Sequence, residues 1–99
     1  MSDEELIREL ERDVEVLQQR GKTDHAAMGR VLAGGLRHAV KEHADAVNEV
    51  IRCGKHGKAP DATPDAVTAL ALAQAIMRER WRLVTDARAQ AQRFLESSH

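Results

Sequence analysis

Apolar residues recur every three or four positions along most of the chain, which is the spacing of one face of an α-helix. In the first twenty residues they are Ile7, Leu10, Val14 and Leu17. Ser2 and Glu5 form a capping box, in which the hydroxyl accepts from a backbone N–H three residues on and the glutamate reaches back. Gly21 is typical of the position just after a helix. The pattern predicts a helix over residues 3–20.

A second helical stripe follows, and its members are Met28, Leu32, Leu36, Ala39, His43, Val47 and Val50. Either residue of Thr23-Asp24 is suited to cap its start, and Gly54 or Gly57 to end it. The pair Gly34-Gly35 interrupts the interior, where each glycine costs about 1 kcal/mol against alanine. This pair either allows close approach of another backbone to a continuous helix or breaks the segment into two shorter helices.

The strongest helix start is Thr63-Pro64-Asp65, because threonine caps, proline suits the first turn and aspartate meets the positive helix end. The stripe behind it consists of Val67, Leu70, Met77, Trp81, Val84, Ala91 and Leu95, widened by Leu72, Ile76, Leu83 and Phe94. It predicts a helix over residues 64–97, preceded by a polar loop at 55–62. Gln74 and Arg88 interrupt the stripe, and we expect them at its margin with buried stems.

These elements predict an all-α fold in one domain over residues 1–99, with no strand pattern or internal repeat. The expected architecture is a three-helix, short-long-long antiparallel bundle, or a four-helix one if the second helix breaks at Gly34-Gly35. With 99 residues the chain builds a thin core. Trp81 and Phe94 are its only aromatic residues besides histidine, so aliphatic side chains must supply that core.

The short first helix can cover only one end of the hairpin formed by the two longer helices. At the other end we expect an exposed apolar surface, which usually marks an interface. Its predicted members are Val47, Val50, Ile51, Val67, Leu70, Leu72, Ile76, Met77 and Trp81. Two such surfaces paired about a two-fold axis would make a homodimer, the commonest oligomer, and a helical partner protein is the other expected occupant.

The formal net charge is -1, which argues against a general polyanion binder. Residues 1–20 carry seven acidic side chains against Arg8, Arg12 and Arg20, and we expect them to neutralise a basic cluster at Arg78–Arg82. That cluster also makes nucleic-acid binding an alternative function, which would use Arg78, Arg80 and Arg82 with Trp81. Nucleic-acid binding is not favoured, because arginines at every second position point to different sides of a helix and Glu79 lies among them.

Glu49, Cys53 and His56 are the candidate metal ligands, because carboxylate, thiolate and imidazole all bind zinc. The spacing lets Cys53 and His56 converge if the helix unwinds there. A closed zinc site needs four ligands, and no second pair of matching spacing is present, so a loop histidine and a small apolar thiol are favoured. His43 lies on the apolar stripe and is a second candidate ligand, for a metal or haem.

The chain lacks a phosphate-binding glycine loop, a G-x-S-x-G elbow and an H-E-x-x-H zinc motif, so we predict no catalytic residues, no enzyme activity and no cofactor. One cysteine, no visible signal peptide and no apolar run of membrane-spanning length lead us to expect a cytoplasmic protein without membrane contacts. The best interpretation is a helical protein-interaction module that acts as a regulator, adaptor or inhibitor through an apolar helix face. A metal- or cofactor-binding bundle is the alternative.

Overall fold

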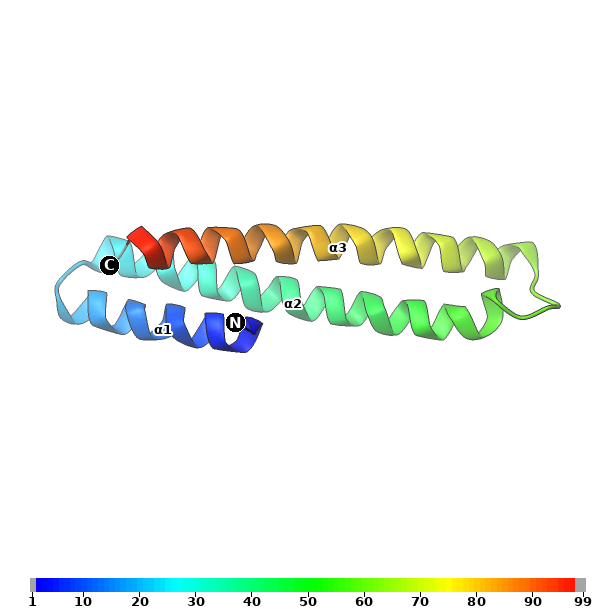
Figure 1. Cartoon of the computed structure of the whole chain (residues 1–99), viewed down its shortest axis with the longest axis horizontal. Helices are drawn as coiled ribbons and strands as arrows, with labels where there is room; N and C mark the ends of the chain where they lie inside the picture. Colours follow the sequence, from blue (N-terminus) through cyan, green and yellow to red (C-terminus); the bar gives the residue numbers. More distant parts are fainter. Residues whose placement is uncertain (1, 98–99) are drawn as a thin grey trace.

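The computed structural model describes residues 2–97, which form α1 (Asp3–Gln19), α2 (Thr23–Gly57) and α3 (Pro64–Ser97). The two long helices make an antiparallel hairpin, and α1 lies along only the end of it that holds the C-terminus (Figure 1). The bundle measures 63 × 18 × 16 Å. The predicted all-α, short-long-long bundle is therefore confirmed, and α2 is one continuous helix.

Local capping explains where α1 begins and ends. The Ser2 hydroxyl accepts from the Glu5 N–H at 3.2 Å, as the capping box predicts. Gly21 adopts a positive φ of 78°, which a residue with a side chain rarely does. The N–H groups of Gly21 and Lys22 donate to the carbonyls of Gln18 and Leu17, closing the helix end. This tight turn folds α1 back along α2.

The start of α2 differs from the prediction, whereas its end at Gly57, one of the two predicted glycines, and the start of α3 agree with it. Lys22 occupies the N-cap position without a side-chain hydrogen bond, so neither Thr23 nor Asp24 caps α2. The helix continues to Gly57, and the predicted loop at 55–62 shrinks to residues 58–63. The Thr63 hydroxyl accepts from the Ala66 N–H at 3.2 Å, which confirms the threonine cap of α3.

The glycine pair does not break α2, which confirms the continuous-helix interpretation, but the close approach expected at the pair is absent. A Cβ atom added at Gly34 or Gly35 would meet nothing within 4 Å. The close approaches lie elsewhere: a Cβ at Gly29 would lie 2.5 Å from Val14 Cγ2 and 2.9 Å from Phe94 Cζ. At the hairpin tip, a Cβ at Gly57 would lie 2.8 Å from the Leu70 Cβ.

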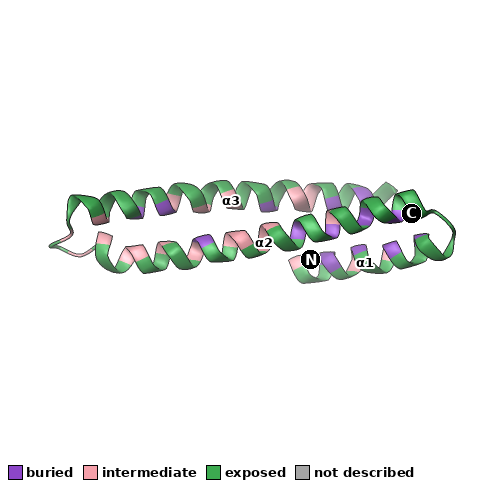
Figure 2. Ribbon diagram, turned by 180° about the vertical axis from the view of Figure 1, so that it is seen from behind, coloured by how far each residue is buried: buried purple, intermediate pink, exposed green. Residues whose placement is uncertain are grey.

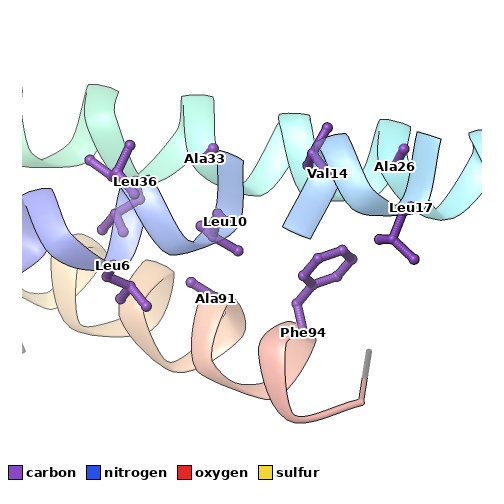
Figure 3. Close-up of a cluster of buried hydrophobic side chains, with 10 residues drawn as sticks. Leu6, Leu10, Val14, Leu17, Ala26, Ala33, Leu36, Ala91 and Phe94 are labelled. Atoms are coloured by element: carbon purple, nitrogen blue, oxygen red, sulfur yellow. The ribbon is translucent and has the colours of Figure 1, made fainter. Parts of the chain in front are cut away.

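The core lies where all three helices meet. Its buried side chains come from all three helices, and Figure 3 shows most of them: Leu6, Ile7, Leu10, Val14, Leu17, Ala26, Ala33, Leu36, Ala91 and Phe94. Burial thins out toward the hairpin tip (Figure 2). The buried hydrophobic residues outside this cluster are small or few: Ala46, Leu70, Ala73 and Val84. The molecule therefore has a sealed three-helix half and a thinner two-helix half.

Candidate interaction groove

The apolar stripe of α3 is a strict alternation of three- and four-residue steps, which is a heptad pattern. Its members are Val67, Leu70, Gln74, Met77, Trp81, Val84, Arg88, Ala91 and Leu95. The set that begins at Leu70 and repeats every seventh residue is buried or half-buried along its whole length. The set that begins at Val67 is covered at Arg88 and Leu95, where α1 is present, and is more open at Val67 and Trp81.

The covered and uncovered members of that set lie along one side of the α2–α3 hairpin, on the line where α1 packs. Arg88 contacts the first residue of α1, and Leu95 packs against the shared core. Beyond the N-terminus of α1 the same line continues without a helix on it. We call this part the open groove and define it by His43, Val47 and Ile51 of α2 and by Val67, Gln74 and Trp81 of α3.

The contact between His43 and Trp81 shows which side of α2 faces the open groove. Its ring lies 5.1 Å from that of Trp81, centroid to centroid, at an angle of 50°. Val47 and Ile51 follow His43 at four-residue steps and therefore lie on neighbouring parts of the same helix surface. Ile51 is 57 % exposed and Trp81 is 46 % exposed. The open groove thus presents large apolar side chains to solvent.

An ion pair marks the point where α1 stops and the open groove starts. Arg88 donates from Nη2 to Asp3 Oδ2 at 2.8 Å, and its Nε donates to the other carboxylate oxygen. The hydrogen bond from Arg88 holds the pKa of Asp3 below its ordinary value, and the charge of Arg88 and the nearby His43 act in the same direction. The pair fastens the first helical residue of α1 to α3.

Trp81 is positioned at this boundary by two neighbours. The guanidinium carbon of Arg88 lies 4.9 Å from the centre of its ring, a cation–π distance, and His43 lies against it from α2. An indole held in place and still half-exposed is a typical anchor for a binding partner, because burying it removes a large apolar area from water without much loss of side-chain freedom.

The nine residues predicted for the interface do not form one surface. Val47, Ile51, Val67 and Trp81 line the open groove, whereas Val50 and Met77, which are half-buried like Val47, lie outside it. Leu70 is only 8 % exposed and packs against Gly57 inside the hairpin, so it is not available to a partner. Leu72 and Ile76 lie on a second flank of α3. Periodicity alone merged these groups, because a wide apolar stripe does not reveal which edge a third helix covers.

The second flank of α3 holds a shallow hollow of about 380 Å³ between α2 and α3. It is lined by Gly35, His38, Ala39, Glu42, Arg80, Leu83, Asp86, Ala87 and Gln90. Arg80 pairs with Glu42 across it at 3.7 Å. Leu72 and Ile76 lie eleven and seven residues before Leu83 and continue this side of α3 toward the hairpin tip. This flank is apolar but is accompanied by carboxylates.

Comparisons with models of known protein families, with curated proteins and with solved structures found no match. The function therefore has to be inferred from the surface of this chain alone. Within residues 2–97, no helix combines the length and the apolar character needed to cross a bilayer.

The basic cluster on α3 is not neutralised by α1, contrary to the prediction. Arg82 donates to Glu79 at 2.6 Å on the same helix, which raises the pKa of the arginine. The acidic residues of α1 instead reach Arg37, through Glu11, and Arg88, through Asp3. Nucleic-acid binding through Arg78, Arg80 and Arg82 stays a prediction, with Arg80 and Arg82 already paired to carboxylates.

The candidate zinc ligands lie on the last turns of α2, which does not unwind there. The Cys53 thiol lies 3.6 Å from a Glu49 carboxylate oxygen, but Arg52 also binds that carboxylate and lowers its pKa. His56 lines a separate hollow with Asp61 and other residues near the hairpin tip. Over residues 2–97, no three His, Cys, Asp or Glu side chains are grouped to hold a metal ion. Zinc binding by Glu49, Cys53 and His56 stays the alternative that the sequence does not favour.

Proposed function

We propose that this protein is a helical interaction module that binds an amphipathic helix in the open groove, in line with α1. The observation that carries the proposal is the partial filling of one groove. Where α1 occupies it, Leu10 is fully buried. Where α1 is absent, the groove keeps an apolar lining at Val67, Ile51 and Trp81 that stays exposed.

The length of the open groove fits a helix. Residues 44–57 of α2 lie beyond the N-terminus of α1 and span about 20 Å at 1.5 Å per residue. By the same rule α1 is about 25 Å long. A partner helix of roughly four turns can therefore lie in the groove. Grooves between helices commonly bind amphipathic helices through anchors spaced at three, four and seven residues.

A second copy of this chain is one of the two partners that the sequence predicts, and it would use the same side chains. Two open grooves facing each other about a two-fold axis would build a four-helix core from two hairpins. Either partner makes the protein a binding module, so catalysis is not part of the proposal. The solution mass by light scattering separates self-association from binding of another protein.

The test compares two matched pairs of substitutions. Ile51→Glu with Val67→Glu places charges in the open groove, whereas Leu72→Glu with Ile76→Glu places them on the second flank. We expect the wild type to bind an apolar fluorescent dye, the groove variant to lose most of that binding and the flank variant to keep it. A wild-type monomer that binds no dye would contradict the proposal.

A further inference from the structure

The open groove has a charge preference that follows from how α1 binds. Residues 1–20 carry seven acidic and three basic side chains, a net charge of -4, and the whole chain has -1, so the remaining residues carry +3. The molecule therefore holds an acidic helix on a basic hairpin. Building on the proposed function, we infer that the partner is an acidic amphipathic helix that resembles α1 in charge.

The occupied half of the groove shows how such a helix is held. Glu11 of α1 pairs with Arg37 on the α2 rim. Asp3 of α1 pairs with Arg88 on the α3 rim. Arg30 and Arg37 line a hollow along the edge of α1, together with Glu11 and Val14. Apolar side chains thus fill the floor of the groove, and carboxylates of α1 meet arginines on both of its rims.

The open half repeats this arrangement without the acidic helix. Lys55 lies one turn after Ile51, and Arg78 lies one turn before Trp81. The positions three and four residues from each open-groove residue are its neighbours on the helix surface. No aspartate or glutamate occupies any of these positions. The open groove therefore has an apolar floor and basic rims, and neither α2 nor α3 places a carboxylate at these neighbouring positions on the same helix. The Asp3 carboxylate of α1 lies beside His43, at the boundary with the occupied half.

The second flank of α3 has the opposite character and serves as an internal comparison. Leu83 has Glu79 and Asp86 within one turn on its own helix. Glu42 also lies against this flank, from α2, in its pair with Arg80. Two apolar surfaces of the same hairpin therefore differ in charge. Only the open groove is complementary to an acidic helix.

The same charges disfavour a second copy in the open groove. Two-fold pairing would bring the two basic rims of one copy, with Lys55 on α2 and Arg78 on α3, against the identical rims of the other. Like charges across an interface weaken association. An acidic helix instead extends the contacts that α1 already makes and places its carboxylates beside Lys55 and Arg78. The inferred partner thus has an apolar stripe with helical spacing and Asp or Glu on both sides of it.

The probe is a pair of synthetic peptides that share one apolar stripe and contain no tryptophan. One peptide carries glutamate at all flanking positions, and the other carries lysine. Trp81 is the only tryptophan of the chain, so its fluorescence reports occupancy of the groove. With the chain of residues 1–99, we expect the glutamate peptide to shift Trp81 emission to shorter wavelength. It should bind at least about tenfold more tightly than the lysine peptide, and less tightly at high salt.

Two sets of variants show which surface binds the peptide and which charges select it. Ile51→Glu should abolish binding of the glutamate peptide, whereas Leu72→Glu should not, and both original side chains are similarly exposed, at 57 % and 61 %. Charge reversal by Lys55→Glu with Arg78→Glu should make the lysine peptide the tighter ligand. These exposed positions lie outside the core, so circular dichroism should show unchanged helix content in every variant.

The outcomes separate this inference from the proposed function. Equal binding of the two peptides, or preference for the lysine peptide, overturns the acidic partner but leaves a helix-binding groove. If neither peptide binds and Ile51→Glu converts a wild-type dimer to a monomer, a second copy fills the groove and the inference is wrong. If neither peptide binds and the wild type is a monomer, both the inference and the proposed function fail.

Discussion

The two halves of the molecule share one hairpin but differ in what covers it. In the three-helix half, Leu10 and Leu36 are fully buried between α1, α2 and α3. In the two-helix half, the same heptad stripe of α3 leaves Val67 and Trp81 open to solvent. The stripe does not change in character at the boundary. The comparison shows that the length of α1, rather than the pattern of the hairpin, decides which residues are available for binding.

The largest expected difference between the halves comes from truncation of their apolar side chains. Leu10→Ala removes a fully buried side chain and leaves a cavity, so it should lower the free energy of unfolding by about 2–5 kcal/mol. Ile51→Ala in the open groove should cost less than about 1 kcal/mol, because the side chain is already exposed. Chemical denaturation measures both. Equal losses would mean that the open groove is covered in solution.

Substitution of two glycines of α2 by alanine should change the free energy of unfolding in opposite directions. Gly29→Ala places a Cβ against Val14 and Phe94, and overpacking of this kind should destabilise the fold by about 1–3 kcal/mol. Gly35→Ala is the matched control in the same helix. It meets open space, and alanine has the higher helix propensity, so it should stabilise the fold by about 0.5–1 kcal/mol. Effects of the same sign would contradict the packing described for α1.

The ion pair at the boundary should contribute about 1–2 kcal/mol, because Arg88 and Asp3 are partly shielded from solvent and share two hydrogen bonds. Arg88→Ala should lower the free energy of unfolding by that amount and loosen the start of α1. A double-mutant cycle with Asp3→Asn isolates the coupling. Independent, additive losses would show that the pair does not fasten α1.

The same pair predicts a pH dependence. Arg88 depresses the pKa of Asp3 in the folded state, so the unfolded chain binds a proton at higher pH than the folded one does. The stabilisation is therefore complete above the ordinary pKa of aspartate, about 4, and is lost as the pH falls through the lower folded value. Asp3→Asn should remove this part of the acid dependence of stability. An unchanged acid transition in the variant would contradict the assignment.

Much of the fold was predictable because helix signals are local. The serine cap at Ser2, the Gly21 turn and the Thr63 cap all involve residues within five positions of one another, and the structure confirms them. The role of Gly34-Gly35 was not predictable in this way. A glycine seen in a sequence does not show whether another helix lies over it, and the helix that makes the close approach in α2 lies over Gly29 instead.

The candidate site was predictable only in part, because its boundary depends on a contact between distant residues. Asp3 and Arg88 are 85 positions apart, and no periodicity links them. Arg88 interrupts the apolar stripe of the sequence. A polar residue at a predicted core position was the signal that could have indicated this contact. Apolar periodicity places Ile51 and Leu72 on one surface, because the division into two flanks depends on where α1 lies.

The smallest effect is expected from charges placed on the two exposed flanks. Ile51→Glu and Leu72→Glu should each change the free energy of unfolding of the isolated chain by no more than about 0.5 kcal/mol, since neither side chain is buried. Thermal denaturation monitored by circular dichroism measures this. A strong destabilisation by Ile51→Glu alone would show that another part of the protein, or a second copy, already covers the open groove.

Native-state hydrogen exchange of the dilute, unliganded chain tests the division into a sealed and an open half most directly. The account predicts slow exchange for the amides of α2 between Ala26 and Leu36, which lie under α1, and faster exchange from Ala46 to Gly57. Local opening is easier where fewer apolar contacts must break. Uniform protection along the whole of α2, or the reverse order, would contradict the claim that half of the groove is left open for a partner.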